Sequence, residues 1–210
     1  MRLRSLIPLL ASLIFASPAA AAVPSPANSV LPSCMALCPF GDMPFTVVVR
    51  DFANNPIAGS SVVLDFALCP GAFLCSQPFG QPYPYTLNAA ARQIQAITNA
   101  SGSVTIPAHV GGTGPPGSVR VYADGVQLRT YALASPDQNG DGAVVSIVDT
   151  DDAIFASKLG TTDPTADFDC SGHVDVADQL TFDAHHSVIC DAFVEPTVRS
   201  TWGAVKLRYR

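Results

Sequence analysis

Several patterns that mark common functions are missing from this sequence. It has no Gly-x-Ser-x-Gly motif or other nucleophile signature. It has no Cys-x-x-Cys pair, and its histidines are not spaced near its cysteines as zinc sites usually require. Residues 23–136 carry four acidic and four basic side chains and form no basic patch, which argues against nucleic acid as a partner. We therefore predict a protein that is not an enzyme and does not bind nucleic acid.

Long apolar runs are lacking after residue 22. The run from Leu6 to Phe15 follows two arginines and precedes small residues, which is the order of a secretory signal peptide. Because this run is short for a membrane span, we favour cleavage near Ala22 over an uncleaved anchor. The sequence thus predicts a signal peptide over residues 1–22. The expected product is secreted, in the extracellular space or at the cell surface, with no membrane span after cleavage.

Six cysteines follow this segment, and an even number in an exported protein favours disulfides over a metal site or free thiols. Residues 23–44, rich in proline, serine and alanine, are expected to be an irregular lead-in. We predict disulfides between the first and second pairs of cysteines, with three pairings open. These two pairs are Cys34 with Cys38 and Cys69 with Cys75.

Short β-branched runs separated by turn residues predict a mainly β unit over residues 45–134. The expected strands are 46–50, 61–66, 103–106, 119–122 and 126–129. We expect the first two to form one hairpin and the last two another, with Asp124-Gly125 at its turn. Strands of this length and spacing favour a β-sandwich.

Two stretches carry a more particular pattern. Residues 49–62 contain Asn-Pro-Ile-Ala-Gly between valines, and residues 98–104 read Thr-Asn-Ala-Ser-Gly-Ser-Val. The pattern resembles secreted bacterial immunoglobulin-like (Big-type) modules. The resemblance implies an immunoglobulin-like sandwich for residues 45–134.

The acidity is confined to residues 137–195, which hold twelve aspartates, one glutamate and only Lys158. Two segments within it, 137–144 and 167–174, share one spacing. Each has oxygen-bearing side chains at positions 1, 3 and 5, glycine at 6 and valine at 8. A calcium loop supplies ligands at positions 1, 3 and 5, a backbone carbonyl at 7, position 9 and an acid at 12, with glycine at 6 for the turn. We therefore predict a duplicated calcium site, with the valines pairing the two loops along a short strand.

The second loop fills every position. Its expected ligands are Asp167, Asp169, Ser171, the carbonyl of His173, Asp175 and Asp178. The first loop offers Asp137, Asn139, Asp141 and the carbonyl of Ala143. Its position 12 falls on Val148, so three extra residues separate the loop from an acid that is either Asp149 or Asp151. The match of residues 151–155 to 178–182 favours Asp151.

A helix-like segment follows each loop, over residues 152–159 and 178–188, and none leads into either loop. Loop then helix, twice, over residues 136–190 resembles the dockerin domain. The resemblance implies a calcium-dependent fold and a cohesin-like or other extracellular protein partner, by association in polysaccharide-degrading assemblies. The alternative is a calcium-stabilised structural surface or matrix protein without a cohesin partner. We also expect a disulfide between Cys170 and Cys190, which bracket the second repeat.

Three features stand outside this scheme. His185 and His186 are expected on an exposed helix face, because neighbouring helical residues point apart and do not share a metal. The proline- and tyrosine-rich residues 77–86 are where an unrecognised enzyme site would be sought. Residues 191–210 are predicted to form a tail with four basic groups. We expect a partly ordered end; the alternatives are a docking or sorting tag, or a segment that folds back on the acidic residues.

Overall fold

The computed structural model describes residues 22–76, 83–144 and 150–190. Residues 1–21 of the predicted signal peptide, the tail 191–210, Asp149 and most of the 77–86 segment lie outside these residues. The described protein is mainly β with two helices and is consistent with the predicted β-sandwich. Its elements are β1 (Phe45–Val48), β2 (Ser61–Asp65), β3 (Phe73–Leu74), β4 (Thr86–Asn88), β5 (Gln93–Ile97), β6 (Ser103–Ile106), β7 (Val110–Gly111), β8 (Gly114–Ala123), β9 (Val126–Leu133), β10 (Ala143–Val144), α1 (Thr150–Lys158), α2 (Val176–Ala184) and β11 (Val188–Ile189).

The largest sheet is antiparallel and has the strand order β4-β5-β2-β8-β9, and β1 pairs separately with β6. Alternate residues of these strands point inward, as the period of two requires. One core therefore takes side chains from both sheets, and the ring of Phe45 on β1 meets Tyr131 on β9 edge to face at 5.5 Å.

One expected hairpin is confirmed and the other is wrong. β8 and β9 pair around Asp124-Gly125, both with positive φ, as a tight hairpin turn needs. β1 and β2 do not pair with each other, because β1 joins β6 while β2 lies between β5 and β8. The turn residues between them form a compact loop in which Asp51 accepts the amides of Ala53 and Asn55, and the chain there passes from one sheet to the other.

The lead-in is irregular, as expected, but it belongs to the core. It forms isolated bridges to β1 at Val48 and, after β9, to Ala134. Its side chains Leu31, Met35 and Leu37 are buried in the main apolar cluster. The lead-in thus runs along the sandwich toward the C-terminal unit.

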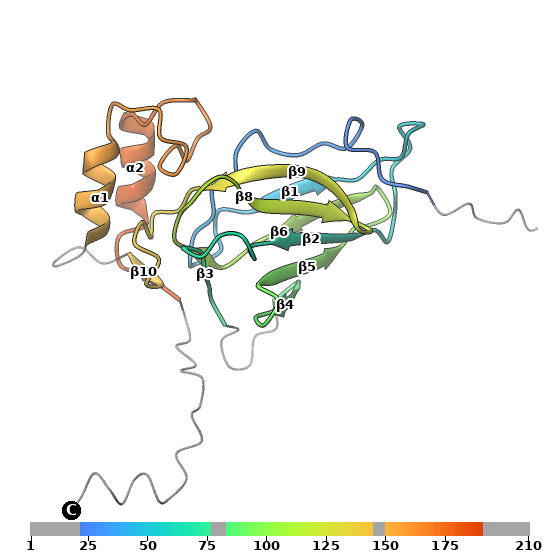
Figure 1. Cartoon of the computed structure of the whole chain (residues 1–210), viewed down its shortest axis with the longest axis horizontal. Coiled ribbons are helices and arrows are strands. Elements are labelled where there is room, and N and C mark those ends of the chain that lie inside the picture. Colours follow the sequence, from blue (N-terminus) through green and yellow to red (C-terminus); the bar gives the residue numbers. More distant parts are fainter. Residues whose placement is uncertain (1–21, 77–82, 145–149, 191–210) are drawn as a thin grey trace, which may run out of the picture.

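The C-terminal unit lies at one end of the sandwich, with α1 and α2 side by side (Figure 1). Phe155 of α1 stacks on Phe182 of α2 at 4.5 Å between ring centroids. Phe168 stacks on the other side of this pair, 5.7 Å from Phe155. This aromatic stack is the centre of a small apolar cluster of seven buried residues. Such a cluster is a modest core, so other interactions must contribute to the stability of the unit.

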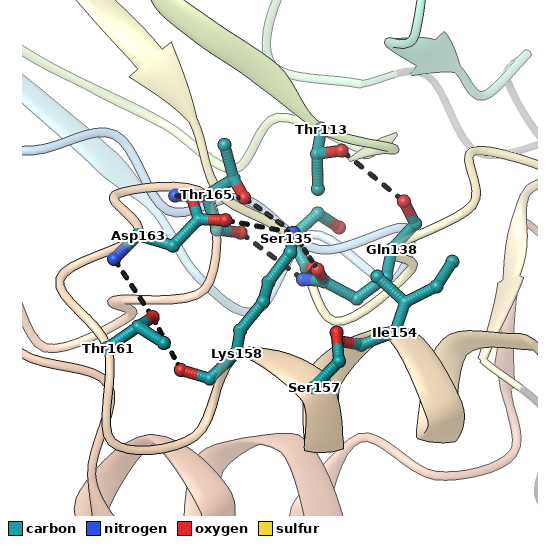
Figure 2. A network of polar contacts seen from close by, with 9 residues as sticks. All are labelled: Thr113, Ser135, Gln138, Ile154, Ser157, Lys158, Thr161, Asp163 and Thr165. Atoms are coloured by element: carbon teal, nitrogen blue, oxygen red, sulfur yellow. Dashed lines mark hydrogen bonds and ion pairs between the residues drawn. The ribbon is translucent and has the colours of Figure 1, made fainter.

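A polar network around Lys158 joins the two repeats (Figure 2). Its ammonium donates to the side-chain oxygens of Gln138 at 2.7 Å and Thr165 at 2.6 Å, and Asp163 lies 3.7 Å away. Burial lowers the pKa of Lys158, and the Asp163 carboxylate opposes that effect. Gln138 belongs to the first loop and Thr165 precedes the second, so the network fixes one loop relative to the other.

The disulfides differ from all the predicted pairings. The structure joins Cys34 to Cys170 and Cys75 to Cys190, and it leaves Cys38 and Cys69 as buried free thiols. The predicted Cys170–Cys190 bond and the bonds between the first two pairs are therefore wrong. The prediction assumed that each unit is stapled internally, whereas the lead-in and the residue after β3 each contribute a cysteine that bonds to the second repeat. Two disulfides agree with an extracellular location.

Among the described residues, no helix is both long and apolar enough to cross a membrane.

The cross-links give a direct test of the fold. We expect protease digestion of the unreduced protein to release peptides that join Cys34 to Cys170 and Cys75 to Cys190, identified by mass spectrometry. Alkylation after unfolding without reductant should label only Cys38 and Cys69. Recovery of a peptide joining Cys170 to Cys190 would contradict this arrangement.

Candidate metal centre

The loops that begin at Asp137 and Asp167 share one hydrogen-bond pattern. In each, the carboxylate at position 1 accepts the amides of positions 5 and 6, at 2.9 to 3.2 Å. The side-chain oxygen at position 3 accepts the amide of position 5, at 2.9 Å from Asn139 and 3.0 Å from Asp169. These bonds curl the backbone of each loop around its own acidic side chains, so the oxygens of each loop point toward the centre of that loop.

Both loops also share their backbone twist. Gly142 and Gly172, at position 6, have φ of 89° and 90°, which is the turn that the sequence predicted. Position 4 is left-handed too, with φ of 76° at Gly140 and 63° at Cys170. The left-handed backbone at position 4 was not predicted from the sequence. Glycine at this position, as in Gly140, indicates such a conformation, but the second repeat has a cysteine there.

In the second loop, the ligand atoms of Asp167, Asp169 and Asp178 lie within 4.8 Å of one another. Asp178 is buried in the first turn of α2, where its carboxylate accepts the amides of Phe168 at 2.6 Å and Asp175 at 2.9 Å. The start of the helix thereby brings the acid of position 12 back onto position 1.

The remaining predicted ligands of this loop lie nearby with different roles. Asp175 caps α2 by accepting the amide of Ala177 at 2.8 Å and is not part of the three-carboxylate cluster. The Ser171 hydroxyl donates to the carbonyl of His173 at 3.0 Å, so the oxygens of positions 5 and 7 are adjacent. This fits a loop in which position 9 reaches the ion through water.

In the first loop, the same convergence joins Asp137, Asp141 and Asp151. Asp151 is buried in the first turn of α1 and accepts the amide of Asn139 at 2.8 Å. It therefore takes the place that Asp178 takes in the second loop, and the three extra residues precede the helix. The other candidate acid, Asp149, lies outside the described residues. Ala143, at position 7, begins β10.

Asp137 is seated directly against the sandwich. The amide of Gly112 donates to its backbone carbonyl at 2.8 Å. A Cβ atom on Gly111 would lie 2.0 Å from a carboxylate oxygen of Asp137. Only glycine therefore fits at position 111, and the close approach of β7 explains why Asp137 is fully buried.

The valines at position 8 do not pair with each other as expected. Val144 of the first repeat lies on β10 and pairs with β11, which follows the helix of the second repeat. Val174 of the second repeat exchanges hydrogen bonds with Gly160 and Thr161, which follow the helix of the first. Each loop is thus tied to the end of the other repeat's helix, and the two repeats interlock.

Burial and neighbouring carboxylates disfavour the ionised form of these aspartates. Burial raises the pKa of Asp137 to about 6; the charge of Asp141 adds to this, and the amides of Gly142 and Gly140 oppose it. Burial also raises the pKa of Asp167, with a further contribution from Asp178. In the part of the chain that the structure describes, no salt bridge reaches these four aspartates. The charge is therefore left for a cation to balance.

The donors in both clusters are oxygen atoms only. Carboxylates, an amide or hydroxyl oxygen and a backbone carbonyl are the ligands that calcium takes, whereas zinc and copper favour nitrogen and sulfur. The residues present thus fit calcium, which would be held by Asp137, Asp141 and Asp151 in one loop and by Asp167, Asp169 and Asp178 in the other.

The prediction that both histidines lie on an exposed helix face is wrong. His185 is buried, with its Nε2 3.2 Å from Asp42 Oδ1, while the Nε2 of His186 lies 3.0 Å from Asp152 Oδ1. The two rings have separate partners, as the geometry of neighbouring helical residues suggests.

Comparison of the chain with protein-family models, curated proteins and solved structures gave no match.

The pKa of Asp137 predicts how pH acts on the metal-free and calcium-bound protein. Because this carboxyl holds its proton more tightly when folded, the stability that Asp137 contributes to the metal-free protein should be fully present below about pH 4 and be lost as the pH rises through about 6. Calcium binds the ionised form, so the rise in Tm that it causes should grow over the same range. Thermal melts with calcium or chelator across this range measure both trends. A calcium-induced shift that does not change with pH would contradict the assignment of Asp137.

Substitution of Asp178 tests the second cluster. Asp178→Asn removes one charged ligand while keeping the size of the side chain, so calcium affinity at this loop should fall roughly tenfold or more. Asp183→Asn, on the same helix but exposed and outside the cluster, is the matched control and should bind as the unaltered protein does. Isothermal titration calorimetry measures both. Equal losses in the two variants would show that Asp178 is not a ligand.

Proposed function

We propose that this is a secreted, calcium-binding, dockerin-like protein that attaches to an extracellular protein partner. The observation that carries the proposal is the duplicated loop. Twice, an acidic side chain at the start of a helix closes on carboxylates from the preceding loop, within 4.8 Å. The same amide pattern supports both sets.

Calcium, when bound, supplies positive charge to carboxylates that are already buried. Asp137, Asp151 and Asp178 are fully buried. Because the apolar cluster of this unit is small, neutralising these charges should decide whether it holds its fold. The interlocked strands carry that effect from each loop to both helices.

A surface for a partner is available on α2. Val176 and Leu180 lie one helical turn apart and are 71% and 66% exposed. Large apolar side chains exposed side by side are typical of protein contact sites. Through the dockerin resemblance, the partner would be a cohesin-type module, and any role in polysaccharide breakdown would come from the assembly rather than from this chain.

A second candidate is a calcium-stabilised structural protein of the surface or matrix. The two disulfides favour it, since they tie the second repeat to the lead-in and to the residue after β3. In this reading, calcium and the disulfides act together to stabilise one unit, and no cohesin binds.

Binding to cohesins separates the two functions. The proposal expects a panel of purified cohesin modules to include one that captures this protein with calcium and releases it with chelator. Leu180→Asp should weaken that capture at least roughly tenfold, because an exposed apolar contact becomes charged. Ile97→Asp, at a similarly exposed apolar site on β5, is the control and should leave capture unchanged.

If no module is captured while calcium still raises Tm, the structural function is supported. If calcium changes neither capture nor Tm, both functions fail.

A further inference from the structure

A third group of metal-binding side chains lies where the lead-in meets the end of α2. The ligand atoms of Cys38, Asp42 and His185 lie within 4.8 Å of one another. Cys38 is a fully buried free thiol and His185 is almost buried, while the side chain of Asp42 is 47% exposed. Unlike the calcium loops, this cluster offers sulfur, nitrogen and oxygen. Asp42 and His185 are 143 residues apart in the sequence.

Cys38 begins a tight turn that ends at Gly41. The amide of Gly41 donates to the carbonyl of Cys38 at 2.9 Å. Burial raises the pKa of the Cys38 thiol, and the backbone amides of Phe40 and Gly41 oppose that effect. Gly41 has φ of 80°, and a Cβ there would lie 2.4 Å from the ring of His109. The turn therefore admits only glycine, and its amides favour the thiolate that a metal ion would need.

The imidazole is oriented by the helix. His185 Nδ1 lies 2.6 Å from the carbonyl of Thr181, which can only accept a hydrogen bond, so Nδ1 carries a proton. In the neutral ring, the lone pair of Nε2 then faces Asp42 Oδ1 at 3.2 Å. Two lone pairs at this distance repel unless a proton or a metal ion lies between them. A histidine whose outer nitrogen donates to a backbone carbonyl is the usual form of a metal ligand.

The cluster does not suit nucleophilic catalysis. Burial raises the pKa of Cys38 to about 12, and the charge of Asp42 adds to this. The free thiol therefore stays protonated at neutral pH, and an unreactive thiol is a poor nucleophile.

We propose that Cys38, Asp42 and His185 bind one Zn²⁺ ion, with the fourth position open to solvent beside Asp42. The donor set of one sulfur, one nitrogen and one oxygen suits zinc. Oxygen and nitrogen ligands of tetrahedral zinc are separated by roughly 3.3 Å, given bond lengths of about 2.0–2.1 Å, close to the 3.2 Å seen here. Binding releases the thiol proton to solvent. The ion would fasten the lead-in to the second repeat beside the two disulfides.

Cobalt is the probe for this site, because a thiolate ligand gives Co²⁺ a charge-transfer band and a tetrahedral site gives it intense visible bands. The full-length protein is stripped with chelator, supplied with excess calcium to fill the oxygen-only loops, and titrated with Co²⁺. We expect both sets of bands at one equivalent of Co²⁺, and their loss when Zn²⁺ is added. Cys38→Ser should lack the charge-transfer band, while Cys69→Ser, at the other buried free thiol, should keep it.

Asp42→Asn provides a variant that does not disturb the core. Because the side chain of Asp42 is about half exposed and the substitution keeps its size, this variant should fold normally, and its affinity for Co²⁺ should fall roughly tenfold or more. Absence of the charge-transfer band in the unaltered protein would overturn the proposal, as would its persistence in Cys38→Ser. In the first case, a protonated His185 Nε2 seen by NMR would assign the cluster to an ion pair with Asp42 alone.

Discussion

The C-terminal unit depends on one constraint, the burial of carboxylates close to one another. Asp137 and Asp178 are fully buried, no salt bridge among the described residues reaches either of them, and each loop gathers three acids within 4.8 Å. Backbone amides donate hydrogen bonds to the carboxylates of Asp137 and Asp178 but do not cancel their charge. The aromatic stack of Phe155, Phe168 and Phe182 is a small core to set against that repulsion, so a bound cation would stabilise the unit.

The interlock of the repeats explains why two loops are needed. Val144 is held by the strand after α2, and Val174 by the residues after α1. Neither repeat can therefore complete its backbone hydrogen bonds alone. The Lys158 network adds a second connection, since it bonds to Gln138 of the first loop and to Thr165 before the second. A change at either cluster is transmitted through these bonds to both helices.

What the sequence predicts well is local. The spacing of acidic residues within one short loop brings Asp167, Asp169 and Asp178 together as expected, and the Asp124-Gly125 hairpin forms. What it predicts poorly depends on distant packing. The pairing of β1 with β6, the two disulfides and the contact of His185 with Asp42 each join two segments that lie far apart in the sequence. No spacing within either segment encodes that meeting.

The two loops are anchored to the rest of the protein in different ways, and this has a consequence. The first is held by packing, because Gly111 lies against the Asp137 carboxylate. The second is held covalently, by the disulfide between Cys34 of the lead-in and Cys170 of the loop. Uncompensated charge at Asp137 therefore acts on the edge of the sandwich itself, whereas charge at Asp167 acts on a loop that its disulfide restrains. A cation bound in the first loop, although this loop departs from the standard spacing, would therefore act more directly on the β unit than one bound in the second.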